Sequence, residues 1–371
     1  MAVNLLTPLD AYDAAALARA HDEAGRAGFR LHRIDAPNER LASWIDFHFA
    51  PSWWSSEAAA GSTWVAERDG EVAGFASFGA RGLRYPWLRA AGAKPGVGIF
   101  GPYGVAEAFR GRGAGVPLLT AALCGLREAG SREALIPAVN DDTLAAMYVA
   151  RTGARIVEEF GYDVGRFRTT ILASGSGTNA RSVMEQVVSG RLPLDLTAVI
   201  TNHAGAGVLE AAATHRIPAA TVAWNRELEA RSAYDARLIA TVESTQPQLV
   251  LLLGWMHLVP PAFLERFPET LNLHPAFLPL DPGADEAAAP DGTRIRALRG
   301  AHALRDAIVT GAAWTGVTVH RVTAATDRGA VLVRTPMPIE EPRTEAALRE
   351  RIRPLEFAAV TAAIRRWTFE R

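Results

Sequence analysis

The second half of the chain alternates short apolar stretches with longer amphipathic ones, and no other feature of the sequence restricts the fold as strongly. Phe167–Ala173 is predicted to be a strand that runs directly into a glycine- and serine-rich turn. Strands and helices are then expected in alternation at Leu196–Thr201, Ala206–His215, Ala219–Val222, Arg231–Ser244 and Gln248–Leu253. This order predicts a mostly parallel sheet with helices on both faces. Such sheets bind ligands at the carboxyl ends of their strands, so candidate residues are sought there.

The first half ends as a separate α/β domain. Asp142–Thr152 is predicted to be a helix, Gly153 to end it, and Ala154–Phe160 to form the next strand. A chain of 371 residues is long enough for two domains. We therefore predict two α/β domains, at residues 1–165 and 166–371.

Composition excludes several classes of function. The net charge is −1 and no run of like charges occurs, so neither nucleic acid nor a membrane surface is expected as a partner. The most apolar stretch, Leu249–Leu258, is about half the ~20 residues of a membrane span. The amino terminus lacks the basic and apolar regions of a signal peptide, so we predict a cytoplasmic protein. Cys124 is the only cysteine and Lys94 the only lysine, which excludes an internal disulfide, a cysteine-built zinc site and a G-K-[ST] phosphate loop.

The turn Ser174–Asn179 opens a helix that is predicted to run through Met184. Glycines let the backbone approach an anion closely, and the free amides at a helix N-terminus attract phosphate. The turn is not a dinucleotide G-x-G-x-x-G motif, because Asn179 and Ala180 stand where a third glycine is expected. Two interpretations stay open, a phosphate-binding loop and an ordinary tight turn between strand and helix.

Asn272 and His274 lie two residues apart in a predicted strand that Pro275 ends. Residues at this spacing project from the same face of a strand. An amide and an imidazole side by side can hydrogen-bond the oxyanion of an acyl transfer, and the imidazole can relay a proton. Asp327 follows the predicted strand Gly316–Val322, and a carboxylate near an imidazole raises the pKa of the imidazole. Taken singly, the histidine is also compatible with a structural role and the aspartate with a simple turn.

Six short motifs follow one another along the second half of the chain. They are Ser-Gly-Ser-Gly-Thr-Asn (174–179), Gly-Trp-Met (254–256), Asn-Leu-His-Pro-Ala-Phe-Leu-Pro (272–279), Arg-Gly-Ala-His-Ala (299–303), Thr-Gly-Val-Thr-Val-His (315–320) and Asp-x-Gly-x-Val (327–331). In this order they resemble the motifs of phosphoribosylglycinamide (GAR) formyltransferases. The resemblance spans residues 170–367. It implies a Rossmann-like formyltransferase domain that uses 10-formyltetrahydrofolate as donor and contains no metal.

The same resemblance implies a site and a mechanism. It places Asn272, His274 and Asp327 at the reacting centre, where the amine attacks the formyl carbon directly. Asn272 and a protonated His274 would hold the oxyanion, and Asp327 would orient His274 and manage protons. The amine acceptor is assigned to Gly177, Thr178 and Asn179, which hold its phosphate, and to Glu356, which contacts its ribosyl or amino end. The folate is assigned to Trp255, Met256, His257 and Leu258 and to Thr326, Arg328 and Gly329.

The chain departs from the family pattern in two places. The segment Asp281–Ala297 is interposed between two family motifs, and its composition predicts a loop or a hairpin around Asp291–Gly292. This segment is either a tolerated surface insertion or a flap that shapes the acceptor site. The basic residue that the family carries after the methionine of the folate wall is replaced by His257.

The first half carries a second anion-binding pattern. A glycine-rich turn lies between a strand expected at Val97–Tyr103 and an apolar helix expected at Val116–Arg127, and Tyr148 precedes Gly153 further along. These features resemble the GNAT acetyltransferase superfamily over residues 61–160. The resemblance implies a mixed-sheet α/β domain in which Tyr148 protonates the departing thiolate. It implies that acetyl-CoA, or another acyl-CoA, is cradled by Arg110, Gly111, Arg112, Gly113, Ala114 and Gly115.

Two features leave the activity of this half open. Four residues rather than three separate Tyr148 from Gly153, and Gly101–Gly104 stands where many family members carry a glutamate. A set of aromatic residues and one histidine is expected to form core and lid packing rather than an acceptor cleft: Trp44, Phe47, His48, Phe49, Trp53 and Trp54. Cys124 is expected in the core.

The leading interpretation is a bifunctional enzyme that formylates and acylates a small, GAR-like amine in specialised metabolism. One alternative is a formyltransferase with a non-catalytic GNAT-like binding module, and another is the GAR formyltransferase of purine biosynthesis with an added domain. The sequence leaves open the acceptor, the order of the two transfers and the oligomeric state, including a homodimer.

Overall fold

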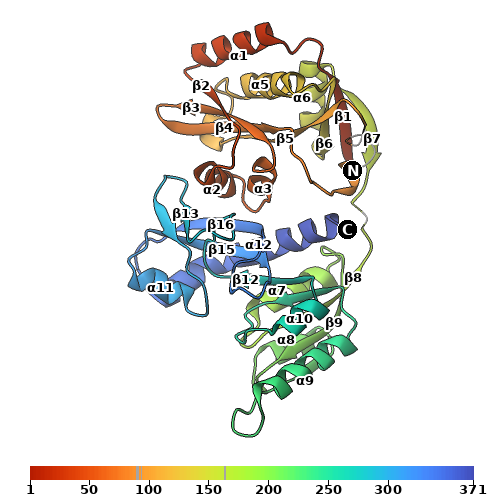
Figure 1. Ribbon diagram of the computed structural model, residues 1–371, viewed down its shortest axis with the longest axis vertical. Helices are drawn as coiled ribbons and strands as arrows, with labels where there is room; N and C mark the ends of the chain where they lie inside the picture. Colours follow the sequence, from red (N-terminus) through yellow and green to blue (C-terminus); the bar gives the residue numbers. More distant parts are fainter. Residues whose placement is uncertain (89–91, 93, 163) are drawn as a thin grey trace. The chain divides into compact units, whose positions relative to one another are not determined.

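The computed structural model describes residues 1–88, 92, 94–162 and 164–371, which fold into two compact units (Figure 1). The first unit comprises residues 1–49, 54–162 and 369–371 of this described part, and the second comprises residues 50–53 and 164–368. The main division therefore lies next to the boundary expected from the sequence, while two short segments belong to the unit formed by the other half of the chain. No helix in the described part of the chain is both long and apolar enough to cross a membrane.

The first unit is built on a seven-stranded mixed sheet. Its strands are β1 (Ala2–Pro8), β2 (Arg30–Ile34), β3 (Ser62–Arg68), β4 (Glu71–Phe78), β5 (Val97–Val105), β6 (Glu133–Val139) and β7 (Arg155–Phe160). Its helices are α1 (Ala14–Arg26), α2 (Glu39–His48), α3 (Trp54–Ala58), α5 (Gly115–Glu128) and α6 (Asp142–Thr152), with short 3-10 turns η1 (Pro86–Leu88) and η2 (Glu107–Phe109). The strand order is β2-β3-β4-β5-β6-β1-β7, and among these described strands only β5 and β6 pair in parallel. The predicted mixed sheet is confirmed.

Local sequence explains where the helices of this unit begin and end. The side chains of Asp13, Asn38 and Asp141 accept backbone N–H groups at the starts of α1, α2 and α6. Such caps satisfy amides that have no partner within the helix. Gly153 ends α6 with a left-handed φ of 68°, a conformation that glycine adopts without steric cost. The predicted sequence of helix, glycine cap and strand is therefore confirmed.

The second unit is built on a seven-stranded, mostly parallel sheet. Its strands are β8 (Phe167–Leu172), β9 (Leu194–Thr201), β10 (Ala219–Thr221), β11 (Leu249–Leu252), β12 (Thr270–His274), β15 (Trp314–Arg321) and β16 (Val331–Pro338). The strands β13 (Glu286–Ala288) and β14 (Arg294–Arg296) form a separate hairpin. The helices are α7 (Thr178–Val188), α8 (Val208–Thr214), α9 (Arg231–Ser244), α10 (Pro261–Arg266), α11 (Ala303–Val309) and α12 (Glu345–Phe369). The sheet order is β10-β9-β8-β11-β12-β15-β16, parallel as far as β12 and antiparallel beyond it.

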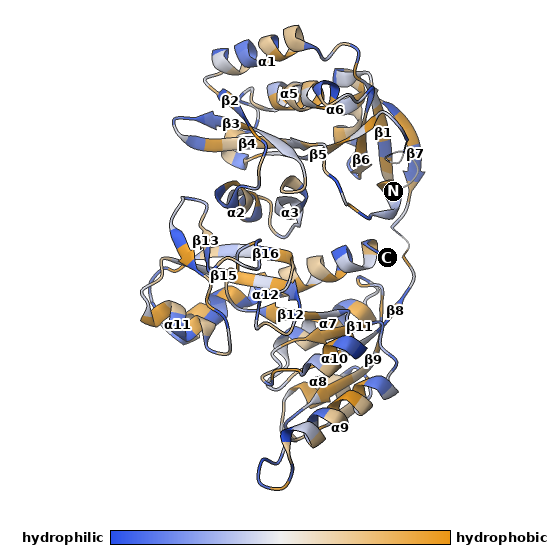
Figure 2. Ribbon diagram, viewed as in Figure 1, coloured by the Kyte–Doolittle hydropathy of each residue, from blue (hydrophilic) through white to orange (hydrophobic). Residues whose placement is uncertain are grey.

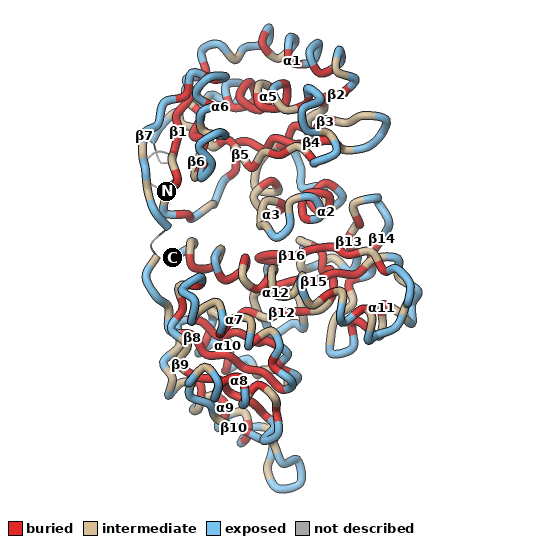
Figure 3. Tube along the Cα trace, turned by 180° about the vertical axis from the view of Figure 1, so that it is seen from behind, coloured by how far each residue is buried: buried red, intermediate tan, exposed pale blue. Residues whose placement is uncertain are grey.

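Helices cover both faces of this second sheet, as the sequence predicts. Ile171 packs into a core that includes residues of α7, α8 and α12, whereas its neighbour Leu172 packs into a core that includes residues of α9 and α10. Successive residues of a strand point to opposite faces, so both faces of β8 must be apolar. Figure 2 shows apolar residues gathered on the strands, and Figure 3 shows the same strands buried. The parallel strands β8, β9, β11 and β12 end at one edge of the sheet, next to the reversal of strand order around β8.

Candidate active site

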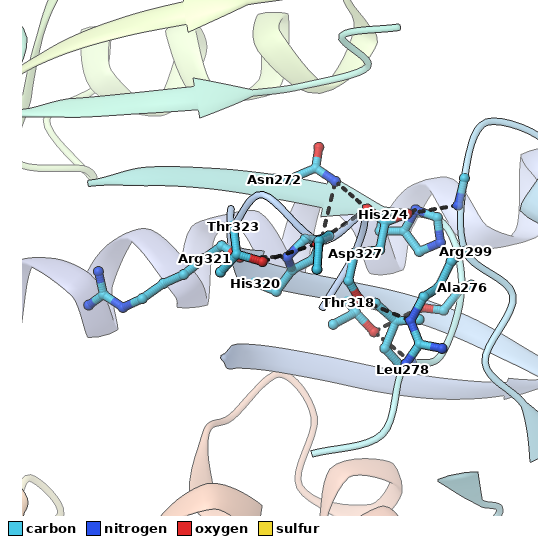
Figure 4. A network of polar contacts seen from close by, with 12 residues as sticks. Asn272, His274, Ala276, Leu278, Arg299, Thr318, His320, Arg321, Thr323 and Asp327 are labelled. Carbon is cyan, nitrogen blue, oxygen red and sulfur yellow. Dashed lines mark hydrogen bonds and ion pairs between the residues drawn. The ribbon is translucent and has the colours of Figure 1, made fainter. Parts of the chain in front are cut away.

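Three polar residues predicted from the sequence come together around the end of β12. Asn272 and His274 are the third and fifth residues of this strand, and the strand ends at His274, as expected from Pro275. Asp327 lies in the loop between β15 and β16 and adopts a left-handed φ of 51°. Figure 4 shows its carboxylate between the side chains of Asn272 and His274.

The distances describe a connected network. Asp327 Oδ1 lies 3.4 Å from Asn272 Nδ2, and Asp327 Oδ2 lies 3.6 Å from His274 Nδ1. His320 Nε2 lies 3.2 Å from Asn272 Nδ2 and 3.4 Å from Asp327 Oδ1. His274 and His320 are buried and Asn272 is half-buried. A substrate atom that reaches Asn272 therefore meets a site whose side chains are already held by one another.

Three neighbouring residues, Leu298, Arg299 and Gly300, hold the network from outside. The N–H of Gly300 donates to Asp327 Oδ2 at 2.7 Å, and the Nε of Arg299 donates to the Asp327 carbonyl oxygen at 3.3 Å. His274 Nε2 lies 2.6 Å from the Leu298 carbonyl oxygen. All three anchors come from the segment that follows the β13–β14 hairpin. This segment therefore sets the position of both the carboxylate and the imidazole.

The turn that follows His274 is held by a side chain of β15. Thr318 donates its hydroxyl to the carbonyl oxygen of Ala276 at 2.8 Å and accepts the N–H of Leu278 at 3.0 Å (Figure 4). Thr318 lies opposite His274 in the antiparallel pair of β12 and β15. The same pairing therefore places His274 and locks the chain that leaves it.

The hydrogen-bond partners assign the tautomers of the two histidines. A carbonyl oxygen only accepts, so His274 carries a proton on Nε2 and, when neutral, presents the lone pair of Nδ1 toward Asp327. His320 lies 2.8 Å from the Arg321 carbonyl oxygen through Nδ1, so its Nε2 accepts from Asn272. The two amide hydrogens of Asn272 thus point at His320 and Asp327, and the second contact is long for a hydrogen bond.

The pKa values of the pair shift in the same direction for different reasons. Burial alone raises the pKa of the Asp327 carboxyl, but a hydrogen bond from His320 in its doubly protonated form, the charge of His274 and the Gly300 N–H outweigh it and lower the pKa to about 2. Burial lowers the pKa of His274, and the Asp327 carboxylate and the Leu298 carbonyl offset only part of that effect. The expected effect of the carboxylate is present, because Asp327 raises the pKa of His274, but burial outweighs this effect and the pKa lies below its ordinary value. Desolvation penalises the imidazolium more than one carboxylate at 3.6 Å favours it.

His320 is a member of the network that we did not predict as a site residue. It lies on β15 directly opposite Asn272, in the antiparallel pair of β12 and β15. The segment Thr315–His320 resembled a family motif, and that motif is the signal that pointed toward it. Its role depends on strand register, which the motif alone does not reveal.

The predicted acceptor loop lies at the carboxyl end of β8. Gly177 has a φ of 71°, and a Cβ added there would lie 2.5 Å from the Val208 Cβ, so only glycine fits without a shift. No side chain caps the start of α7, where Thr178 is exposed. Asn179 Nδ2 donates to Glu356 Oε2 at 3.0 Å, and burial raises the pKa of the Glu356 carboxyl. The loop therefore offers helix-start amides to an anion, beside an amide–carboxyl pair.

The predicted folate wall follows β11. Trp255 is buried, whereas Met256 and Leu258 are 54% and 67% exposed. Ser174 accepts the Met256 N–H at 2.9 Å and so joins this wall to the acceptor loop. His257 Nδ1 lies 2.9 Å from the Tyr234 hydroxyl, and burial together with nearby arginines lowers the pKa of His257. The replacement of a basic residue at position 257 therefore leaves a mostly neutral ring at neutral pH.

The other predicted wall is the loop that carries Asp327. Thr326 is exposed. A Cβ added at Gly329 would lie 1.6 Å from the carbonyl oxygen of Arg321, so the loop lies directly on β15. Arg328 donates to the carbonyl oxygens of Pro282 and Gly283 at 3.0 and 3.2 Å. Its side chain is thus directed at the start of the interposed segment.

The interposed segment Asp281–Ala297 forms the predicted hairpin, with Gly292 at its turn and a φ of 89°. Ala287, Ala289 and Ile295 are buried against Phe277, which belongs to the motif after His274. A purely exposed insertion does not bury its own apolar residues in this way. The hairpin is therefore an integral part of the second unit. Among the described residues, no group of three or more His, Cys, Asp or Glu side chains is arranged to hold a metal ion.

In the first unit, the predicted acyl-CoA loop presents backbone groups rather than a network of side chains. Gly111 and Gly113 have φ values of 72° and 94°, and α5 begins at Gly115 without a side-chain cap. The pair of β5 with β6 extends only from Val97 to Ile99, so β5 separates from β6 before it reaches this loop. The exposed residues 110–113 precede the buried Ala114. The arrangement leaves free amides at the start of α5, which suits a pyrophosphate.

The side chains of this region form less of a network than those around Asp327. Tyr148 is 4% exposed, its ring contacts that of Phe100 edge-on, and burial raises its pKa strongly. Burial also raises the pKa of Tyr103 to about 12. A Cβ added at Gly115 would lie 2.7 Å from the Tyr103 hydroxyl. Tyr103, on β5, is therefore a polar group at the helix start that the sequence analysis did not single out.

The aromatic residues of the first half mostly pack against one another. Trp44 is buried and contacts Phe49 and Phe75, and Trp54 contacts Phe49 and Phe75 as well. Trp53 instead packs against the core of the second unit, and Phe47, in the same sequence cluster, is 42% exposed. Cys124 is buried in α5, as predicted.

Comparison with known proteins agrees with this division. Residues 167–364 match the family described as formyl transferase, and residues 28–154 match the acetyltransferase (GNAT) family. The chain is 34% identical over 198 residues to a phosphoribosylglycinamide formyltransferase of Mycobacterium tuberculosis, covering 53% of this chain and 83% of that protein. The corresponding Escherichia coli protein is 29% identical over 194 residues, covering 51% of this chain and 81% of that protein. A solved structure of glycinamide ribonucleotide transformylase 1 from Symbiobacterium toebii is 32% identical, with a TM-score of 0.49, and covers 57% of this chain and 92% of its own.

Proposed function

Because this chain belongs to the formyl transferase family and also carries a GNAT acetyltransferase domain, we propose that it is a bifunctional transferase acting on a small amine. The second unit transfers a formyl group from 10-formyltetrahydrofolate to the amine of a phosphorylated, GAR-like metabolite. The first unit transfers an acyl group from acetyl-CoA or another acyl-CoA. The observation that carries the proposal is that the Asp327 carboxylate lies 3.4 Å from Asn272 Nδ2 and 3.6 Å from His274 Nδ1.

The proposed chemistry assigns one task to each side chain. The folate, when bound, supplies the formyl carbon. Asn272 redirects the N–H that makes the long contact with Asp327 toward the oxygen that gains negative charge during attack. Neutral His274 accepts the proton of the attacking amine at Nδ1, and Asp327 stabilises the resulting imidazolium without itself becoming protonated. As the bond between the formyl carbon and the folate nitrogen breaks, the imidazolium would return this proton to that nitrogen, which leaves as the amine of tetrahydrofolate. The low pKa of Asp327 supports this assignment, because the carboxylate stays ionised throughout.

Observations on the described residues support the fit of the three ligands. The exposed apolar side chains of Met256 and Leu258 suit the ring of a folate. The uncapped start of α7 suits a phosphate, and the Asn179–Glu356 pair suits polar groups of the acceptor. The glycine-rich turn before α5 suits the pyrophosphate of an acyl-CoA.

A second candidate function for the first unit is binding without catalysis. Gly101–Gly104 supplies no carboxylate at the position of the family's usual base, and Tyr148 lies among aromatic rings. These observations favour a module that binds acyl-CoA or a partner and leaves chemistry to the second unit.

Assays with the full chain separate these proposals. The protein is incubated with 10-formyltetrahydrofolate and GAR, and product is followed by mass spectrometry. Rapid formylation of GAR supports a GAR-like acceptor. Turnover with other phosphorylated amines but not with GAR shows that GAR itself is not the acceptor. Failure with every phosphorylated amine tested contradicts the proposed acceptor class. Acetyl-CoA binding by calorimetry, followed by acetylation of the same amine, distinguishes a catalytic first unit from a binding module.

A further inference from the structure

The start of the interposed segment contacts Arg299 and Arg328 through the Asp285 carboxylate and through neighbouring carbonyl oxygens. Asp285 Oδ1 accepts from Arg299 Nη1 at 3.0 Å and also from Arg328 Nη2. The preceding residues complete the contact, because Ala284 accepts from Arg299 at 2.7 Å and Pro282 accepts from Arg328 at 3.0 Å. The start of the hairpin thus binds two guanidinium groups at once.

Both arginines are linked directly to Asp327. Arg328 is the next residue in the chain, and Arg299 donates from Nε to the Asp327 carbonyl oxygen at 3.3 Å. Gly300, which follows Arg299, donates its N–H to the Asp327 carboxylate. Asp327 adopts a left-handed φ of 51°, a conformation that a residue other than glycine keeps only when its surroundings hold it.

From these contacts we infer that Asp285 is a positioning residue for formyl transfer. It holds Arg299 and Arg328, which in turn hold the backbone of Asp327 so that its carboxylate faces His274 and Asn272. The interposed segment would then be more than a tolerated surface insertion, because it contacts the arginines that hold the loop between β15 and β16, which carries Asp327. This inference rests on the proposed formyl transfer.

The exposure of Asp285 makes the inference testable without loss of the fold. Its side chain is 74% exposed, so substitution leaves no buried cavity. Glu286, the next residue, offers a matched control, because its carboxylate pairs with Arg294 and is likewise exposed. The variants are Asp285→Asn, Asp285→Glu and Glu286→Gln, each with its thermal unfolding midpoint measured.

Steady-state formyl transfer is the first readout. We expect Asp285→Asn to lower kcat about tenfold with KM values within about twofold of wild type, because a misplaced catalytic group slows chemistry more than binding. Asp285→Glu should restore most of kcat, and Glu286→Gln should match wild type. If Asp285→Asn keeps kcat within about twofold of wild type, the inference is overturned. It is equally overturned if Asp285→Glu fails to rescue kcat.

A second readout does not require turnover. The imidazole of His274 is titrated by NMR in the free protein, where it faces Asp327, His320 and Arg299. Loss of the Asp285 charge leaves Arg299 and Arg328 without their shared counter-ion, so the pKa of His274 should fall further in Asp285→Asn and stay unchanged in Glu286→Gln. If the wild type formylates none of the acceptors, the proposed function fails and this titration decides the inference. A lower pKa then supports it, and an unchanged pKa overturns it.

Discussion

The two units present different kinds of groups to their proposed ligands. Around Asp327, side chains from β12, β15 and two loops converge and hold one another in place. At the start of α5, the prominent feature is backbone, with two left-handed glycines and an uncapped helix. A cradle of backbone amides can bind an anion whether or not chemistry follows. A loop that binds an anion through its backbone is therefore weaker evidence of catalysis than a set of side chains with matched tautomers.

The strand topology explains part of the difference. In the second unit, β12 and β15 pair so that Asn272 lies opposite His320, and the loop after β15 returns Asp327 to the same place. In the first unit, β5 and β6 pair only near their start, and β5 then continues alone with β4 toward the loop. A gap between strands exposes backbone, whereas continuous pairing brings side chains together.

Asp327→Asn is expected to give the largest difference between the activity of the second unit and the ligand binding of the first. The amide keeps the shape of the carboxylate but cannot stabilise an imidazolium, so kcat for formyl transfer should fall about 10³-fold. Acetyl-CoA binding, measured by calorimetry, should be unchanged. Asp195→Asn, at an exposed position on β9, is the control. A near-wild-type formylation rate in Asp327→Asn would remove the carboxylate from the mechanism.

Asn272→Ala tests the other side of the network. Loss of an oxyanion donor typically costs about 10²-fold in rate, and we expect that loss in kcat. Folate binding should persist, because the apolar wall after β11 is untouched. Calorimetry with the folate and the thermal midpoint serve as checks. An Asn272→Ala enzyme that keeps its kcat would contradict the oxyanion assignment.

The second unit should also lose stability on acidification in a way that depends on Asp327. Its folded pKa of about 2 is below the ordinary value of about 3.9, so the carboxylate contributes about 2 kcal/mol that is present above pH ~5 and lost as the pH falls toward 2. The lowered pKa of His274 acts in the same direction at higher pH, because protonation below about pH 6.5 is penalised in the folded state. Urea unfolding at pH 7, 5 and 3 should show the gap between wild type and Asp327→Asn shrinking. A gap independent of pH would show that the charge of Asp327 does not stabilise the fold.

The smallest effect is expected from Tyr148→Phe. Acetyl transfer should slow about tenfold, less than for a well-matched general acid, because burial raises the pKa of Tyr148 far above neutrality. Formyl transfer should stay within about twofold of wild type. Tyr162→Phe, a tyrosine of the same unit packed on Trp87, is the control. If Tyr148→Phe acetylates at the wild-type rate, the Tyr148 hydroxyl is not the proton donor. The first unit would then lack the one side chain assigned to its chemistry.

Much of the fold could be predicted because its signals are local. Helix α9 was expected at Arg231–Ser244 and has those bounds, and the turn at Asp291–Gly292 forms the expected hairpin. Asn272 and His274 share a strand, so their common direction follows from a spacing of two residues. Periodicity, turn residues and caps act within a few residues, and a single sequence displays them directly.

The remaining features depend on contacts between distant segments. His320 reaches Asn272 only through the register of two strands 48 residues apart, and Gly300 reaches Asp327 across 27 residues. The sequence by itself determined which chemical groups this protein can bring to a site, namely amides, imidazoles, carboxylates and two glycine-rich turns before helices. Only the tertiary structure decided which of these groups lie close together and which nitrogen of each imidazole carries a proton. Strand register and desolvation are properties of the packed chain, and they set both the distances and the pKa values.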